Sequence, residues 1–479
     1  MVYIKPYKGN QIQLVADDPS LLNLIRDHFS IPNPAYRGSM TWLPKRIYAI
    51  TPTFRAEIGL VPEISKFLHQ YPIQHRVDPL VTSQLYPRKY LFGDSDSADI
   101  PYKELKGLDR TFRDYQDAAI RTAINKGRGI CRVATSGGKT LIMAGLILNQ
   151  CPKKTVVIVP NTQLVEQTAK DFKEYGLNGV SKWSGTNPLQ ADSSIIICNT
   201  QILLSKNTDL TFLEQFDLVL MDECHQLGVR NNENNKIFKY IATYNIFGFT
   251  GTLPPSKINE WNIIGKIGPV FFEEGVKSLL AKGHITNFSI TVLELEHKRP
   301  PKFIIDVTKP TKAYIEEQEH LMKLERRNDI IAKLAIQLKS NTLIMVDRLF
   351  YGELLEAVLK GKTQQPIYFI QGVMEMDDRE KIRALMDTQS DVIVIAMSKI
   401  FSTGINIPNL SNIIFSSAGK SFVRIIQSIG RSLRLHPTKT KANIFDICDN
   451  LRYSKKHADE RLKIYDKEDY PYKTKKIQI

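Results

Sequence analysis

Short apolar segments alternate with amphipathic helical segments from about Lys103 to about Phe415, and this alternation constrains the fold more than any other feature. It is typical of parallel sheets, because neighbouring parallel strands need a crossover connection that usually contains a helix. The pattern occurs in two blocks, which predicts two α/β sheets in tandem. The predicted strands are 130–133, 156–159, 195–198, 218–221 and 246–249 in the first block, and 342–346, 367–370, 392–396 and 412–415 in the second.

The first 92 residues lack this alternation and are predicted to form a small α+β domain. Asp18 followed by Pro19 is a typical helix start, and a second helix is expected from about Pro62. Between them, aromatic and basic residues interleave, as on surfaces that stack bases and contact phosphates. The alternative is an aromatic core with a solvated basic rim, and the sequence leaves both interpretations open. The interleaved residues are Tyr36, Arg37, Trp42, Lys45, Arg46, Tyr48, Phe54 and Arg55.

The chain length and a polar stretch at 93–99 suggest the domain boundaries. A chain of 479 residues is expected to hold about three domains, at roughly 100–200 residues each. The polar stretch is predicted to be a linker. We predict a nucleic-acid-binding domain at 1–92, α/β domains at 93–280 and 281–450, and a basic extension at 451–479.

The composition restricts the class of partner. Lysine and arginine number 65 against 50 acidic residues, and the formal charge of +15 favours a polyanion, either nucleic acid or an anionic membrane. No apolar run reaches the roughly 20 residues of a membrane span, which disfavours the membrane. The five cysteines are scattered without a CxxC pair, which argues against a disulfide framework or a zinc site. We therefore expect a reducing cytoplasm and mostly buried thiols.

The stretch Ala134–Thr140, ATSGGKT, joins a predicted strand to a predicted helix. A glycine turn before Lys-Thr at a helix start surrounds phosphates with backbone N–H groups, with Lys139 on the β- and γ-phosphates and the Thr140 hydroxyl on Mg²⁺. Val133 stands where GxxxxGK[ST] has its first glycine, and the alternative is a chance glycine turn. The turn residues expected at the phosphates are Ser136, Gly137 and Gly138.

An acidic pair, Asp222-Glu223, directly follows the predicted strand 218–221. Carboxylates at the carboxyl end of a parallel strand suit a site that transfers phosphoryl groups, with Asp222 holding the metal ion and Glu223 orienting the attacking water. A solvated loop is the alternative for this pair alone. Because the glycine turn is predicted in the same sheet, the catalytic interpretation is favoured.

Two further clusters complete the predicted site. Arg113 and Gln116 lie one helix before the glycine turn, where a glutamine amide can pair with adenine. Arg431 and Arg434 lie three residues apart and hence on one helix face. Arginines delivered from a second domain can stabilise the charge that spreads over the γ-phosphate oxygens, so both are arginine-finger candidates. The alternative for each cluster is an ordinary surface helix.

The order of these motifs resembles that of the superfamily 2 helicases over about residues 111–449. The stretches that carry the resemblance are RxYQ at 113–116 (Q motif), ATSGGKT at 134–140 (motif I), VPNTQLV at 159–165 (Ia), TQ at 200–201 (Ib), DECH at 222–225 (II), GFTGT at 248–252 (III), TGINIP at 403–408 (V) and QSIGRSLR at 427–434 (VI). The resemblance implies two RecA-like domains, ATP and Mg²⁺ as ligands, and nucleic-acid-stimulated ATP hydrolysis. It adds Gly404 and Gln427 as ATP contacts.

Residues 29–68 and 455–461 are similar to a branch of phage recombination helicases. This similarity implies a DNA helicase and translocase that remodels branched DNA, by Holliday-junction branch migration, fork regression and dissociation of D-loops or R-loops, in recombination, repair or replication. The implied partners are branched or double-stranded DNA and RNA–DNA hybrid, without a membrane. The implied protein is monomeric or weakly associating in the host-cell cytoplasm.

Two departures from the helicase pattern and three alternatives remain. Motif I has Ser136-Gly137 where Gly-Ser is commoner, and motif V has Asn406 where aspartate is frequent, so an amide replaces a carboxylate there. One alternative is an RNA helicase with the same engine. The others are a restriction-type motor subunit without a nuclease and a non-motor binding protein with a vestigial phosphate loop, which the intact lysine, acidic pair and arginines disfavour.

Overall fold

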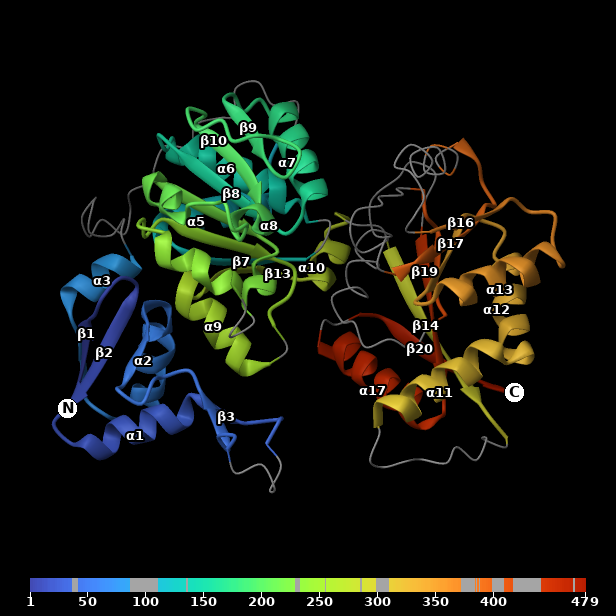
Figure 1. Cartoon of the computed structure of the whole chain (residues 1–479), viewed down its shortest axis with the longest axis horizontal. Helices are drawn as coiled ribbons and strands as arrows, with labels where there is room; N and C mark the ends of the chain where they lie inside the picture. The colour runs from blue at the N-terminus through green and yellow to red at the C-terminus, as the bar shows by residue number, and fades with distance from the viewer. Residues whose placement is uncertain are drawn as a thin grey trace. The chain divides into compact units, whose positions relative to one another are not determined.

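The computed structural model divides into two compact units (Figure 1). The first contains Met1–Ala134 and Gly138–Glu274, and the second runs from Gly275 to Ile479. The residues that the structure describes are 1–36, 42–86, 111–134, 137–228, 233–254, 256–284, 287–298, 310–371, 384, 386, 388–398, 409–416, 441–467 and 470–479.

A seven-stranded parallel sheet forms the centre of the first unit, as the alternating pattern predicts. Its order is β13 (Val270–Glu274), β7 (Gly129–Val133), β12 (Ile246–Thr250), β11 (Leu218–Asp222), β8 (Thr155–Val159), β10 (Ile195–Asn199) and β9 (Val180–Trp183). The helical segments are α5 (Asp114–Lys126), α6 (Lys139–Gln150), α7 (Thr162–Glu174), α8 (Thr200–Leu203), η2 (Leu210–Gln215), η3 (Cys224–Gly228), η4 (Glu233–Tyr240) and α9 (Lys257–Ile267). Both faces of the sheet are covered, which is why β8 and β10 are buried throughout and consist mainly of apolar residues.

The N-terminal region is an α+β structure with a mixed four-stranded sheet. The sheet order is β5 (Arg55–Glu57), β2 (Gln11–Ala16), β1 (Val2–Pro6) and β6 (His75–Val77), and a hairpin joins β3 (Ser30–Pro32) to β4 (Arg46–Tyr48). The helices are α1 (Pro19–His28), η1 (Ile58–Leu60), α2 (Val61–Gln70) and α3 (Pro79–Leu85). The predicted helix start is confirmed, because the Asp18 carboxylate accepts the Ser20 backbone N–H at 2.8 Å and proline occupies the first turn.

The N-terminal region shares a hydrophobic core with the first parallel sheet. Gly59 and Gly265 permit the close approach: a Cβ on Gly59 would clash with the backbone of α9, and a Cβ on Gly265 would lie 2.7 Å from the Glu57 side chain. The fully buried Arg128 guanidinium donates to the carbonyls of Ile267 at 2.8 Å and Gln84 at 3.5 Å. The region therefore belongs to the first compact unit, and its predicted boundary at 92 stays a prediction.

A second seven-stranded parallel sheet forms the other unit. Its order is β16 (Ile367–Ile370), β17 (Ile393–Met397), β15 (Thr342–Val346), β18 (Asn412–Phe415), β19 (Lys441–Asp449), β14 (Asn287–Glu296) and β20 (Tyr472–Gln478). Its helices are α10 (Val276–Ala281), α11 (Pro310–Lys323), α12 (Glu325–Gln337), α13 (Leu349–Lys360) and α17 (Arg452–Lys467). The predicted pair of tandem α/β sheets is confirmed.

The segment 451–479, which the sequence marks as a basic extension, is part of this second unit. It supplies α17 and the edge strand β20, which pairs in parallel with β14. The Glu317 carboxylate accepts the backbone N–H groups of Tyr453 and Ser454 at the start of α17. Tyr465 is fully buried and Ile477 packs against the core, so these apolar side chains attach the segment to the sheet.

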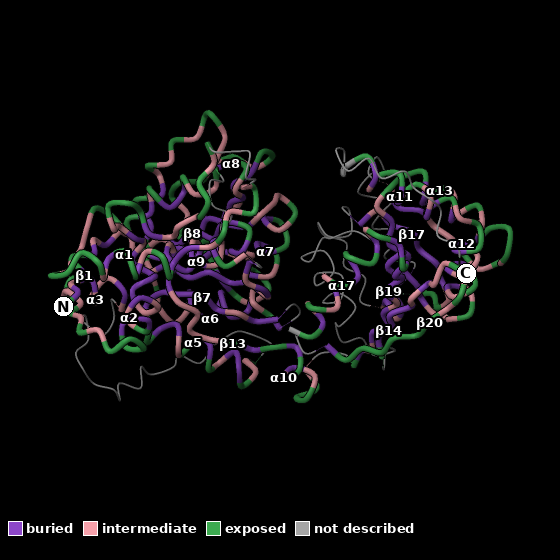
Figure 2. Tube along the Cα trace, turned by 90° about the horizontal axis from the view of Figure 1, so that it is seen from below, coloured by how far each residue is buried: buried purple, intermediate pink, exposed green. Residues whose placement is uncertain are grey.

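The buried residues run along the central strands of each unit (Figure 2). All five cysteines are free thiols and four of them are buried, as the composition predicts. Within the described ranges, no helix has the length and apolar character needed to cross a membrane.

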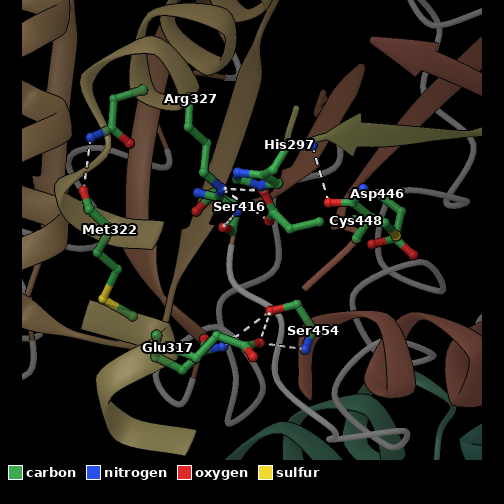
Figure 3. A network of polar contacts seen from close by, with 12 residues as sticks. His297, Glu317, Met322, Arg327, Ser416, Asp446, Cys448 and Ser454 are labelled. Atoms are coloured by element: carbon green, nitrogen blue, oxygen red, sulfur yellow. Dashed lines mark hydrogen bonds and ion pairs between the residues drawn. The ribbon is translucent and has the colours of Figure 1, made fainter. Parts of the chain in front are cut away.

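A buried polar network lies at the carboxyl end of the second sheet (Figure 3). The Arg327 Nε donates to both Asp449 carboxylate oxygens, at 3.0 and 3.2 Å. Its Nη1 donates to the Tyr351 hydroxyl at 2.7 Å and its Nη2 to the Ser416 carbonyl at 2.8 Å. His297 Nε2 lies 3.0 Å from Asp449 Oδ1. The network therefore joins α12 and α13 to the ends of β14, β18 and β19.

Candidate active site

The glycine turn leads from β7 into α6, where the sequence places a phosphate site. Gly138 has φ +76°, which strongly favours glycine, and forms the N-cap of α6. A Cβ on Gly138 would also displace the side-chain amide of Gln116, but the positive φ is the main reason for glycine at this position. Gly137 is buried, whereas Ser136 lies outside the described residues. The start of α6 therefore presents backbone N–H groups in the way that phosphate sites require.

Lys139 is the first residue of α6, and its side chain is only 10% exposed. Its Nζ lies 3.7 Å from Glu223 Oε1. Burial opposes the charge of this ammonium, but the carboxylates of Glu223 and Asp222 outweigh burial and raise the pKa of Lys139. The lysine is therefore fully charged at neutral pH, as a contact to phosphate requires.

The acidic pair occupies the carboxyl end of β11. Burial, followed by the charge of Glu223, raises the pKa of Asp222 to about 6. Burial would raise the pKa of Glu223 as well, but Lys139 and His225 outweigh burial and lower it. The environment thus shifts the pKa values of the two carboxyl groups in opposite directions. Glu223 is therefore the better candidate for an ionised group that orients water.

Glu223 also has a strained backbone, with φ +47°. A non-glycine residue in this left-handed region costs on the order of 1–3 kcal/mol, and such residues cluster at functional sites. The Glu223 backbone N–H donates to Asp222 Oδ1 at 2.9 Å, which helps to hold the turn. The strain is consistent with a side chain whose direction is fixed by function.

His225 connects the acidic pair to the end of the neighbouring strand β12. Its Nδ1 lies 2.9 Å from Thr250 Oγ1 and 3.4 Å from Glu223 Oε2. The Thr250 hydroxyl donates to the Thr252 carbonyl at 2.7 Å, so we assign the proton of this hydrogen bond to His225 Nδ1. His225 Nε2 is then an acceptor, and it is buried without a partner in the described part of the chain.

The sequence does not predict the contact between His225 and Thr250, although His225 belongs to the DECH motif and Thr250 to the GFTGT motif. The two motifs meet because β11 and β12 are parallel neighbours in the sheet, with Asp222 opposite Phe249. Parallel neighbours bring their carboxyl ends to one edge of the sheet. The order of strands in the sheet, however, cannot be read from the sequence.

Gln116 lies beside the glycine turn, as predicted from its position in the chain. It is 3% exposed, its Oε1 accepts the Arg113 backbone N–H at 3.0 Å, and its amide lies against Gly138. The Arg113 guanidinium donates to the Tyr115 hydroxyl at 3.3 Å. Helix α5 thus brings these residues to the start of α6, and their role in binding adenine stays a prediction.

The proposed Mg²⁺ ligands are the Thr140 hydroxyl in the first turn of α6 and the Asp222 carboxylate. Both offer hard oxygen donors, which suit Mg²⁺, and phosphates and waters commonly complete such a site. In the described residues, no group of three or more histidine, cysteine or acidic side chains forms a ready metal cage. Bound there, Mg²⁺ would neutralise phosphate charge. The predicted residues Gly404, Gln427, Arg431 and Arg434 lie outside the described residues.

Comparisons with known proteins agree with this arrangement. The family "Type III restriction enzyme, res subunit" matches residues 109–255, and the family "Helicase conserved C-terminal domain" matches residues 322–436. The ATP-dependent DNA helicase UvsW of Enterobacteria phage T4 is 26% identical over an alignment that covers 96% of this chain and 97% of the relative. The similarity therefore includes the regions that lie outside the two family matches.

Two solved structures share the fold. The ATP-dependent Type ISP restriction-modification enzyme LlaBIII bound to DNA has a TM-score of 0.56 at 15% identity, covering 78% of this chain and 32% of that chain. S. cerevisiae Dbp5 bound to RNA and ADP BeF3 has a TM-score of 0.51 at 13% identity, covering 76% of this chain and 89% of that chain. Because one was solved with DNA and the other with RNA, the fold alone does not select a polymer. The matched families, the extent of the similarity to UvsW and the two parallel sheets together identify the chain as an ATP-dependent helicase of superfamily 2.

Proposed function

We propose that this helicase is a DNA translocase that remodels branched DNA in phage recombination, repair or replication. The observation that carries the proposal is the similarity to the T4 DNA helicase UvsW over nearly the whole of both chains. The reactions we propose are Holliday-junction branch migration, fork regression, and dissociation of D-loops or R-loops. The proposed partners are branched or double-stranded DNA and RNA–DNA hybrid.

The geometry of the first sheet supports the proposed hydrolysis step. Lys139 contacts the β- and γ-phosphates, and Glu223, held ionised by Lys139 and His225, orients the attacking water. Arg113 and Gln116 bind the adenine. We also propose that Gly404 and Gln427 contact ATP and that Arg431 and Arg434 stabilise the charge on the γ-phosphate.

Movement requires the state of the nucleotide to reach the strand-binding segments. His225 supports such coupling, because its ring contacts both Glu223 and Thr250, which ends β12 and is the third residue of the GFTGT motif. We propose that the segments after β8 and β10 grip the DNA backbone. Phosphate contacts carry such a grip, so binding is expected to depend strongly on salt and hardly on base sequence.

The proposed DNA surface of the N-terminal region can be narrowed to the neighbourhood of the β3–β4 hairpin. Trp42 is 76% exposed and precedes β4, and the Arg26 guanidinium stacks 3.7 Å from the Tyr48 ring centroid. Phe54, in contrast, packs against the core. Among the interleaved residues, Phe54 therefore fits the interpretation as an aromatic core, whereas the exposed Trp42 fits a nucleic-acid surface. We propose Trp42 as a stacking platform for a base.

A panel of matched substrates tests the proposed function. ATP hydrolysis and strand separation are measured on forks, four-way junctions, D-loops, R-loops, linear duplex and structured RNA, with Lys139→Ala as the inactive control. Branched DNA is expected to stimulate hydrolysis most, and Lys139→Ala is expected to bind DNA without turnover. Stimulation by RNA alone would instead assign an RNA helicase, and robust turnover by Lys139→Ala would refute the assigned site.

A point variant tests the N-terminal surface better than a deletion, because removal of residues 1–92 would uncover the core shared with α9. Trp42→Ala is expected to weaken junction binding by about 1–3 kcal/mol, the value of one stacked base. Leu24→Ala is the matched control, since Leu24 is also exposed but lies on α1. Equal junction affinity of Trp42→Ala and wild type would instead favour the alternative of an aromatic core with a solvated basic rim.

A further inference from the structure

A cavity of about 590 Å³ lies between the N-terminal region and the first parallel sheet, away from the residues assigned to ATP. One wall is the turn between β1 and β2, with Lys8 and Asn10, and the other comes from η4 and the residues that follow it. Both walls belong to the first compact unit. The volume is within the roughly 300–1,000 Å³ of typical small-ligand sites.

The charged side chains in the lining are four lysines and two glutamates, which leaves an excess of positive charge. Lys266 is paired with Glu57 at 3.1 Å, and Lys236 with Glu233 at 3.2 Å. Lys8 and Lys239, by contrast, have no acidic partner within 4 Å among the residues that the structure describes. The second glutamate of the lining is Glu214, which is exposed. Two lysine side chains at one cavity are thus available for an anion.

Aromatic rings lie beside these lysines. Tyr240 and Tyr244 are half-buried members of the lining, whereas Phe238 is buried under the Lys266 ammonium, 5.4 Å from its ring centroid. Asn10, in the opposite wall, has a buried Oδ1 without a hydrogen-bond partner in the described residues. A rotation of this amide would offer an acceptor to a ligand N–H group. Lysines with stackable rings and an amide match the chemistry of a nucleotide.

The cavity and the active site lie at opposite ends of the same strand. Tyr244 lies two residues before the start of β12, and Thr250 at the other end of β12 contacts His225. Six residue steps in a strand span roughly 20 Å, so one nucleotide cannot occupy both places. The cavity is therefore separate from the site that binds ATP.

We propose that this cavity binds an unpaired nucleotide of single-stranded nucleic acid. Lys8 and Lys239 contact its phosphates, and Tyr240 or Tyr244 stacks on its base. A duplex turns its bases inward, so only an unpaired strand offers a base face and a phosphate to one cavity. The proposal rests on the proposed function for the identity of the polymer, since remodelling of branched DNA produces unpaired strands. The cavity would hold such a strand while the motor acts elsewhere on the substrate.

Lysine footprinting on the full chain tests the proposal. Acetylation of Lys8 and Lys239 is followed by mass spectrometry with a thymidine dodecamer, with thymidine monophosphate at equal nucleotide concentration, and with inorganic phosphate. The dodecamer alone is expected to slow acetylation of both lysines several-fold. Lys66 and Lys153, which are exposed and lie outside the cavity, should react at unchanged rates.

The outcomes separate this proposal from the proposed function. Unchanged acetylation of Lys8 and Lys239, with ATP hydrolysis still stimulated by the dodecamer, would overturn the cavity site alone. Equal protection by the monophosphate or by phosphate would reassign the cavity to a free nucleotide or a simple anion. A chain that neither binds DNA nor is stimulated by it would overturn the proposed function itself.

A charge variant provides an independent measurement. Each phosphate contact of a single strand contributes about 0.7 to the slope of log affinity against log salt. Lys8→Gln/Lys239→Gln is therefore expected to lower that slope by about 1.4 for the dodecamer, with basal ATP hydrolysis and thermal unfolding unchanged. Lys66→Gln/Lys153→Gln removes the same charge and should leave the slope unchanged. Equal slopes for the two double variants would contradict the proposal.

Discussion

The two parallel sheets both carry a buried charged cluster at their carboxyl ends, but the clusters are satisfied to different degrees. In the second unit, every guanidinium nitrogen of Arg327 donates a hydrogen bond, and its contacts to Asp449 are 3.2 Å or shorter. In the first unit, Lys139 and His225 approach Glu223 only to 3.7 and 3.4 Å, and His225 Nε2 is an unpaired acceptor within the described residues.

The difference indicates which cluster is prepared for a ligand. A fully satisfied buried network makes one arrangement more stable than its alternatives, and loss of one partner leaves an uncompensated charge. A loosely paired cluster beside a strained residue such as Glu223 has donors and acceptors that a ligand can use. We therefore expect the same location to serve catalysis in the first sheet and structure in the second.

The largest expected effect is on hydrolysis. Glu223→Gln keeps the side-chain shape but removes the charge that orients water, and the rate of ATP hydrolysis is expected to fall by about 10²–10⁴. Because the Glu223 contacts are long and its backbone is strained, the melting temperature should not fall. Steady-state hydrolysis with saturating DNA and differential scanning calorimetry measure both. A stable hydrolysis rate, or a melting temperature several degrees lower, would show that Glu223 is structural.

Disruption of the Arg327–Asp449 network is expected to lower stability, in contrast to Glu223→Gln, which is expected to lower hydrolysis. Arg327→Met removes the guanidinium partner of the buried Asp449 and leaves the His297 ring beside it, and such removal typically costs about 3–5 kcal/mol of unfolding free energy. Hydrogen exchange of the β14 and β19 amides in the full chain should rise accordingly, while the amides of β8 and β10 stay protected. The double variant Arg327→Met/Asp449→Leu removes both charges and is expected to recover much of the protection. No recovery would show that shape, and not charge, dominates the network.

Much of the fold could be predicted from the sequence because its signals are local. Strands such as 195–198 are continuous apolar runs, and the Asp18-Pro19 cap requires only neighbouring residues. The placement of Lys139 and Glu223 near one another also follows from motif positions at the carboxyl ends of strands. The motif that carries Lys139 was readable even though Val133 replaces its first glycine.

The remaining features depend on pairs that are distant in the chain. Arg327 and Asp449 are 122 residues apart, and neither stands in a motif. The contact of Gly59 with α9 depends on a lack of side-chain volume at two distant glycines, which no composition or periodicity reveals. The sequence marks 451–479 as a basic extension, and its attachment to the second sheet depends on distant contacts, namely the burial of Tyr465 and the pairing of β20 with β14.

A smaller effect is expected at the link between hydrolysis and movement. Thr250→Val removes the hydroxyl that accepts from His225 Nδ1 and leaves that N–H only the Glu223 carboxylate, 3.4 Å away, at a cost of about 1 kcal/mol. Unwinding per ATP hydrolysed should fall more than hydrolysis itself, because the contact joins η3, which follows the acidic pair, to the end of β12. Thr168→Val, at a buried position on α7, makes the same chemical change as a control. Equal losses of hydrolysis and unwinding would leave Thr250 with a structural role only.

The smallest expected effect is the dependence of stability on pH, which has opposite signs in the two clusters. Burial would raise the pKa of Asp449, but Arg327 and His297 outweigh it and hold the pKa below its ordinary 3.8. Its contribution to stability is therefore complete above pH 3.8 and is lost as pH falls through the lower folded value. Asp222 behaves in the reverse way, because a pKa raised to about 6 means that its ionised form destabilises the fold above that pH.

Urea unfolding without magnesium, compared between pH 3 and pH 7, distinguishes the two signs. Asp449→Asn should be less stable than wild type near neutral pH, and the difference should shrink below pH 3.8 as the wild-type carboxyl is protonated. Asp222→Asn should be more stable than wild type at pH 7, and its advantage should disappear as pH falls from about 6 toward 4. If the unfolding free energies of the two variants, relative to wild type, changed with pH in the same direction, both carboxylates would serve structure. The contrast between a ligand-binding cluster in the first sheet and a structural one in the second would then not hold.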